Sequence, residues 1–172
     1  MGLLDIFRSK NKPQGEILVE FTDEEIEVIN KHLESWRSWA AEKGGELALT
    51  PKALQAIKAQ GLSEYALQLV TKTNDSNLSR GEIAGILDKA AKMQLKAHCL
   101  HNLPIFLFYV AYDYELAGNN EMAATWFRNF LTMQNEFKPD KFDEGCLRFL
   151  AGASGCDVAD AVEYAHGKVG KE

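Results

Sequence analysis

The sequence predicts an all-α protein, with at most a minor two-stranded ribbon beside the helices. Three observations support this prediction: apolar residues recur at helical spacing, capping residues precede these stretches, and glycine or proline separates them. The chain has 172 residues, of which 46% are hydrophobic and 26% charged, and this suits one globular domain with a buried core. We expect a flexible or amphipathic N-terminal segment, residues 1–15, and a single helical domain over residues 16–172.

The N-terminal segment is short, basic and partly apolar. A helix over residues 2–10 would place Leu3, Leu4 and Phe7 on one side. The charged residues of the segment are Asp5, Arg8, Lys10 and Lys12. Such a helix favours weak contact with an anionic membrane surface or with a partner groove. Nine residues are few for a stable free helix, so a frayed end or a flap on the domain's own core is the other interpretation.

Two short stretches favour extended structure. Residues 16–21 (EILVEF) have the composition of a strand, and residues 46–50 (ELALT) are the one plausible partner. A lone ribbon of this kind is marginal unless helices pack on it. The ribbon is therefore a minor addition to a helical fold.

The first long helix is expected over residues 22–43. Thr22 and Glu25 form a capping box, and Gly44 with Gly45 ends the helical pattern. Its outer face is acidic, which is typical of a solvated surface and could also attract a basic partner. The buried stripe is expected to contain Ile26, Ile29, Leu33, Trp36 and Ala40.

Caps and breakers mark the remaining helices. The expected ranges are about 51–61, 63–70, 79–101, a hairpin within 104–139, 141–151 and 157–168. The residues that open them are Thr50 with Pro51, Ser63, Ser79 with Glu82, Pro104, Asp140 and Asp157.

The hairpin within residues 104–139 is strongly aromatic and turns at Gly118. Its marker residues, counted from Pro104, are Leu107, Val110, Ala111, Tyr114, Gly118, Ala123 and Phe127. These positions make the hairpin resemble a tetratricopeptide repeat, a 34-residue helix-turn-helix unit. It departs from the pattern at Phe130, where the repeat has a small residue, and at Pro139, which comes four residues late. About three repeats are needed for a stable array, so we expect one repeat-like hairpin inside a small helical domain.

The resemblance implies a groove lined by the first helix of the hairpin, with Ile105, Phe108, Tyr112 and Glu115 facing it. The alternative is that these aromatic residues fill the core, because the helix is apolar nearly all round. The implied function is that of a non-enzymatic protein-protein interaction or scaffold domain. Its partner would be another protein or peptide, or a second copy of the chain.

His98, Cys99 and His101 are the candidate metal ligands. A spacing of three places both imidazoles on one helix face. Two ligands do not make a site, and Cys146, Cys156 or His166 could join only through the fold. The other interpretation is that these histidines favour the negative end of the helix dipole. The alternative function is thus a small-molecule or metal-binding helical protein that uses His98, His101 and a cysteine, although we expect no cofactor.

The remaining motifs exclude several classes of protein. No nucleophile elbow, phosphate-binding loop or zinc-protease motif is present, although an enzyme site assembled from distant residues stays open. A net charge of -6 argues against nucleic-acid binding. The sequence has no apolar run long enough to span a membrane. Three irregularly spaced cysteines are typical of reduced thiols, and the expected location is cytoplasmic.

Overall fold

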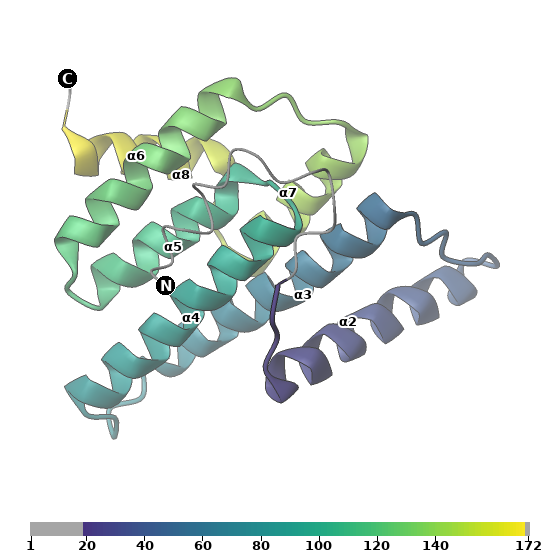
Figure 1. The fold of residues 1–172 in the computed structure, drawn as a ribbon, viewed down its shortest axis with the longest axis horizontal. Helices are drawn as coiled ribbons and strands as arrows, with labels where there is room; N and C mark the ends of the chain where they lie inside the picture. The colour runs from purple at the N-terminus through teal and green to yellow at the C-terminus, as the bar shows by residue number, and fades with distance from the viewer. Residues whose placement is uncertain (1–18, 171–172) are drawn as a thin grey trace.

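A computed structural model of the chain describes residues 19–170, and over this range every regular element is a helix (Figure 1). The helices are α2 (Asp23–Glu42), α3 (Pro51–Lys72), α4 (Arg80–Leu100), α5 (Pro104–Leu116), α6 (Asn120–Glu136), α7 (Lys141–Ser154) and α8 (Val158–Val169). The prediction of an all-α helical-hairpin fold is confirmed.

The minor ribbon is not formed by the described residues. Residues 19–21 and 46–50 are connecting segments without strand structure. Residues 16–18, and the whole N-terminal segment 1–15, lie outside the described range. The stretch 46–50 instead leads into α3, where Thr50 acts as the N-cap and its hydroxyl accepts a hydrogen bond from the amide of Ala53 at 3.2 Å.

Successive helices pack as antiparallel neighbours in the centre of the molecule (Figure 1). The pairs α3 with α4, α4 with α5, and α5 with α6 form its body. The last two helices do not extend this row: α7 packs on α3, and α8 packs on α6 and α5. Helix α2 lies at one edge beside α3, and its opposite face has no neighbouring helix in Figure 1. The edge position of α2 leaves a long helical surface open.

Helix α3 runs without a break through Gly61 and Ser63, and the predicted division into two helices is wrong. A Cβ added at Gly61 would lie 2.9 Å from the Cβ of His32, so glycine permits close approach of α2. Ser63 is fully buried, and its hydroxyl donates to Oε1 of Gln94 in α4 at 2.6 Å. Both residues serve contacts with neighbouring helices, which their local helix-ending preferences do not reveal.

Apart from Ser63, the predicted capping residues lie at the starts of their helices, but at α2 Glu25 does not complete the capping box. Ser79 and Glu82 form a complete capping box, in which the Glu82 carboxylate accepts from the Ser79 amide at 2.7 Å. At α2 the Thr22 hydroxyl accepts from the Glu25 amide at 3.2 Å. The Glu25 carboxylate turns inward and accepts two hydrogen bonds from Lys96 of α4, both at 2.8 Å. A capping residue thus also fastens α2 to the body.

The core lies around the α5–α6 hairpin. Its largest fully buried side chains include Phe106, Tyr109, Phe127 and Phe130. Phe130, the departure from the repeat pattern, is completely buried and fills the centre of the core. The stripe of α2 is narrower than predicted: Ile29 and Ala40 are buried, but Ile26 is exposed because α2 contacts the body along one side.

Candidate functional site

The predicted groove residues of α5 are largely enclosed. Ile105 is 2% exposed and Phe108 4%. Tyr112 is half-buried, and its ring stacks on that of Phe108 with centroids 6.1 Å apart. Neither Ile105 nor Phe108 presents a surface to a partner in this arrangement.

Helix α8 covers what remains of that face of α5. The Tyr164 ring lies 6.0 Å from the rings of Phe108 and Tyr112 and 5.8 Å from that of Phe127. The Tyr164 hydroxyl donates to the Glu115 carboxylate, which also forms an ion pair with Lys168. Burial, followed by the bond to Glu115, raises the pKa of Tyr164. The surface that the tetratricopeptide resemblance assigns to a partner is thus occupied by the chain's own C-terminal helix.

The two candidate histidines have different partners. His98 is buried, and its Nδ1 lies 3.4 Å from the carbonyl oxygen of Leu103. Burial lowers the pKa of His98, and this carbonyl opposes the shift in part. His101 instead places Nε2 2.8 Å from Oδ1 of Asp143 on α7. Burial raises the pKa of the Cys99 thiol, which therefore stays protonated at neutral pH. Across residues 19–170 there is no group of three His, Cys, Asp or Glu side chains placed to hold a metal ion.

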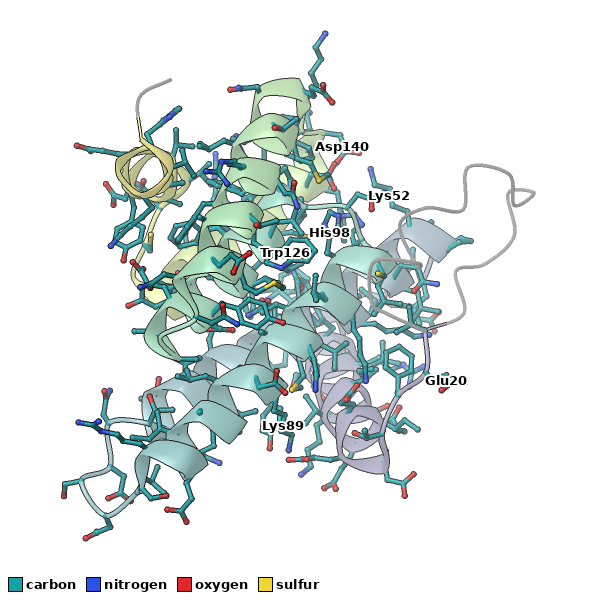
Figure 2. All side chains as sticks on the ribbon, turned by 60° about the vertical axis from the view of Figure 1, so that its left-hand side comes forward. Glu20, Lys52, Lys89, His98, Trp126 and Asp140 are labelled. Carbon is teal, nitrogen blue, oxygen red and sulfur yellow. The ribbon has the colours of Figure 1, made fainter. Side chains whose placement is uncertain are left out.

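His101 opens on a pocket of about 390 Å³ between α3, α6 and α7. The lining residues are Lys52, His101, Asn102, Met133, Glu136, Phe137 and Asp143. Lys52 forms an ion pair with Asp140 and lies 3.5 Å from Oδ2 of Asp143. The bond from Lys52 and the backbone amide of Asp143 lower the pKa of Asp140 to about 2. Figure 2 shows Lys52 and Asp140 at the same end of the molecule.

Lys52 lies between two carboxylates at this pocket, and the His101 imidazole is oriented by one of them. Asp143 is buried with both of its oxygens engaged. Glu136 adds a further carboxylate to the lining. The described lining contains no serine, threonine or cysteine nucleophile. The cluster of Lys52, His101, Asp140 and Asp143 therefore fastens α7 to α3 and to the end of α4.

The open face of α2 has the opposite character. An open surface follows this helix, and its described lining comes from α2 alone, so it is an exposed helix face without a second described wall. The lining residues are Asp23, Ile26, Glu27, Asn30, Lys31, Glu34, Ser35, Ser38, Trp39 and Glu42. Trp39 is 52% exposed and Ile26 is 44% exposed. Trp39 is thus a large, half-exposed side chain of a residue type that often anchors protein interfaces.

The outer face of α2 is negatively charged. It carries four carboxylates, those of Asp23, Glu27, Glu34 and Glu42, and Lys31 is the one cation among the described lining residues. Two of the four are paired within the helix, Glu27 with Lys31 at 2.7 Å and Glu34 with Arg37 at 2.6 Å. Two further acids of α2 turn inward and stabilise its attachment: Glu24 contacts Lys89 and Tyr65, and Glu25 contacts Lys96. The bond from Lys89 lowers the pKa of Glu24. The acids of α2 thus form two sets: Glu24 and Glu25 attach the helix to the body, and the other four lie on its outer face.

A small polar network supports the exposed Trp39. Its ring packs edge-on against Trp36, with centroids 5.6 Å apart. The indole Nε1–H of Trp36 donates to Nε2 of His32 at 3.2 Å. On the other side of the imidazole, Nδ1 lies 3.4 Å from Oε2 of Glu64 in α3. Trp39 therefore rests on groups whose positions are fixed by α3.

Sequence reasoning did not select Trp39 as a functional residue. The period of α2 places Trp36 on the inner side and Trp39 three residues further on, at the margin of the stripe. The sequence feature that could have indicated Trp39 is a tryptophan outside the buried stripe of an acidic helix. Comparison of the chain with protein-family models, curated proteins and solved structures gives no match. Over residues 19–170, none of the helices is long and apolar enough to cross a membrane.

Proposed function

We propose that this chain is a non-enzymatic protein-binding module that receives a basic amphipathic helix on the outer face of α2. The single observation that supports this function is the exposed Trp39 on an open helix face that also carries four carboxylates. Exposed apolar residues scattered singly need no functional explanation. Trp39 differs because it is a large aromatic side chain on an acidic helix face that no other described helix covers.

Burial of Trp39 by a partner would supply binding free energy. A tryptophan side chain buries about 150–250 Å² on full enclosure. Covering the exposed half of Trp39 would therefore remove roughly 100 Å² from water, which is worth about 2–3 kcal/mol. That is the size of effect found for tryptophan anchors at protein interfaces. Ile26 is a second exposed apolar side chain of α2, but the helical period places it about 140° around the axis from Trp39, so Trp39 is the one apolar anchor of its side of the helix.

The charges select the kind of partner. The outward carboxylates run from Asp23 to Glu42, a distance of about 28 Å at 1.5 Å per residue. A helix of about 18 residues matches this length. Lysine or arginine along its flanks would meet these carboxylates, while leucine-type residues on its apolar face would meet Trp39. An acidic partner would be repelled.

A synthetic peptide tests this function. We expect a helical peptide of about 18 residues, with lysines on one face and leucines on the other, to bind the protein in a fluorescence anisotropy titration. Trp39→Ala should weaken binding about ten-fold or more. The same peptide with glutamate in place of lysine should not bind.

Leu116→Ala is the matched control for this titration. Leu116 is 44% exposed, as Ile26 is, but it lies at the end of α5. Trp39→Ala should weaken binding of the lysine peptide, and Leu116→Ala should not. Equal affinities of the Trp39→Ala and Leu116→Ala variants would contradict a docking site on α2.

We also propose a tetratricopeptide-like packing for the α5–α6 hairpin and a cytoplasmic location. The packing is supported by the turn at Gly118, where φ is 80°, and by the buried small residues Ala111 and Ala123. It does not extend beyond the hairpin, because α7 packs on α3. The location is supported by Cys99, Cys146 and Cys156, which are free thiols.

Binding of a small polar molecule beside His101 is a second candidate function. The pocket there has a volume typical of small-molecule sites, and Asp143 orients the imidazole. It uses one of the two predicted histidines, with no cysteine in the described lining. A fragment that perturbs the His101 resonances in the wild-type protein and loses binding in His101→Phe would support this function. A screen without such a fragment would contradict it.

A further inference from the structure

His32 lies beneath the proposed docking face, where α2, α3 and α7 meet. Its ring contacts Phe149 of α7 edge-on, with centroids 5.8 Å apart, and its Cβ faces Gly61 of α3. The imidazole is mostly buried, with 12% of its side chain exposed. A histidine enclosed in this way can bind or release a proton, but its ring has little room to reorient.

Both ring nitrogens of His32 have defined roles. Nε2 accepts the indole N–H of Trp36, so this nitrogen must keep its lone pair. The proton of the neutral ring then belongs on Nδ1, which faces the Glu64 carboxylate at 3.4 Å. Glu64 is the charged group that faces the ring from α3, and Gln60 of that helix is its neutral polar neighbour. From α7 the ring meets uncharged Phe149.

Protonation of His32 would break one of these bonds. A second N–H would form at Nε2 and point at the N–H of Trp36, so that two donors would face each other. The contact between Nδ1 and Glu64 would strengthen at the same time. The Trp36 indole N–H would lose the one hydrogen bond that it donates among the described residues, and the ring against which Trp39 packs would be released.

We propose that His32 is a proton-sensitive positioning residue for the α2 face. In its neutral form it holds Trp36, and through Trp36 it holds Trp39 in the docking position. In its protonated form it releases both rings, so that affinity for the partner helix falls on mild acidification. This inference rests on the proposed docking function of α2 and adds its regulation.

The electrostatics of the site agree with this direction. Burial lowers the pKa of His32, while Glu64 and then Gln60 oppose the shift. The neutral, holding form is therefore the one present at neutral pH. Release begins as the pH falls below the ordinary histidine value of about 6.5.

Nuclear magnetic resonance tests the switch without any partner. The Trp36 indole N–H resonance, assigned with a Trp36→Phe variant, should shift along the same curve as the His32 imidazole between about pH 7.5 and pH 5. His32→Gln retains an acceptor for Trp36 and does not titrate. In that variant the indole resonance should stay constant. An indole resonance that ignores the titration of His32 in the wild-type protein would overturn the proposal.

The lysine-leucine peptide tests the effect on docking. We expect wild-type affinity to fall about five-fold between about pH 7.5 and pH 5.5, the equivalent of one lost neutral hydrogen bond. His32→Gln and Trp36→Phe should each keep their affinity across this range. Equal losses in the wild-type protein and in both variants would overturn the proposal. Failure of the peptide to bind even at pH 7.5 would contradict the docking function itself, and a titrating indole resonance would then still support the contact between His32 and Trp36.

Discussion

At the residue scale, the position of α2 depends on the absence of a side chain at Gly61. The Cβ of an alanine there would lie 2.9 Å from the Cβ of His32, and each of these atoms is attached directly to its own helix backbone. Neither atom is the end of a flexible chain, so relief requires the two helices to move apart. The same contact supports His32 and, through it, the two tryptophans of α2.

Gly61→Ala is expected to destabilise the protein by about 1–3 kcal/mol, because overpacking outweighs the better helix propensity of alanine. Gly85→Ala is the matched control, since it lies in the exposed interior of α4 with nothing near its Cβ position. That variant should gain about 0.5–1 kcal/mol. Urea denaturation measures both. A gain in stability for both variants would show that α2 does not approach α3 closely.

Asp113 is a buried acid of α5 whose Oδ2 has no hydrogen-bond partner among the described residues. Burial raises its pKa well above the ordinary value. The folded state therefore binds the proton more tightly than the unfolded state does. The resulting stability is fully present below the unfolded pKa near 3.9 and is lost as the pH rises towards the folded pKa.

Asp113→Asn removes this loss. We expect the variant to be more stable than the wild-type protein at pH 7 by about 1 kcal/mol or more, because no charge has to be buried. The difference should shrink at about pH 4, where the wild-type carboxyl is protonated in the folded state and about half protonated in the unfolded state. Thermal unfolding at the two pH values measures it. A difference that grows on acidification would contradict the sign.

At the element scale, α8 determines whether the aromatic face of α5 is accessible. Few of its side chains are fully buried, and these are the small ones of Ala161 and Ala165. Tyr164 supplies ring contacts to α5 and α6 and the hydrogen bond to Glu115. Tyr164 is thus the largest side chain by which α8 contacts α5 and α6, beside the buried Ala161 and Ala165 and the ion pair of Lys168 with Glu115.

Tyr164→Ala is therefore expected to increase amide hydrogen exchange throughout α8 and to leave α3 and α4 unchanged. Tyr164→Phe keeps the ring and loses the bond to Glu115, so its exchange should lie close to that of the wild-type protein. Exchange in α8 that is the same in Tyr164→Ala as in the wild-type protein would show that other contacts hold this helix.

The sequence was informative where structure is local. Thr22, Thr50, Ser79, Asp140 and Asp157 cap the helices that they were predicted to open, because a cap bonds to amides three residues away or fewer. Gly61 and Ser63 misled the prediction for α3, since their roles depend on His32 and Gln94 in other helices. No local pattern predicts such contacts.

The candidate sites were predictable to a smaller extent. The helical period marks Phe108 and Tyr112 as neighbours on α5, and their rings do stack. It does not reveal that Tyr164, more than fifty residues later, covers them. His101 and Asp143 are likewise distant in sequence and meet only through the packing of α7 on α3. Trp39 is visible in the sequence, but its exposure depends on which side of α2 faces α3.

At the scale of the whole molecule, charge is distributed by function. Cations of α3 and α4 face inward carboxylates: Lys89 and Lys96 hold the start of α2, and Lys52 holds the start of α7. The outward carboxylates Glu27 and Glu34 of the edge helix α2 instead pair with Lys31 and Arg37 of the same helix. A net charge of -6 adds a long-range field that favours encounter with a basic partner.

Chemical-shift mapping of the lysine-leucine peptide on the labelled protein tests the central claim most directly. We predict that the perturbed amides follow the outer face of α2 between Glu27 and Glu42, with Trp39 among them, and that those of α5, α6 and α8 stay unchanged. Perturbations centred on Phe108, Tyr112 and Tyr164 would contradict this account and assign docking to the α5 face after displacement of α8.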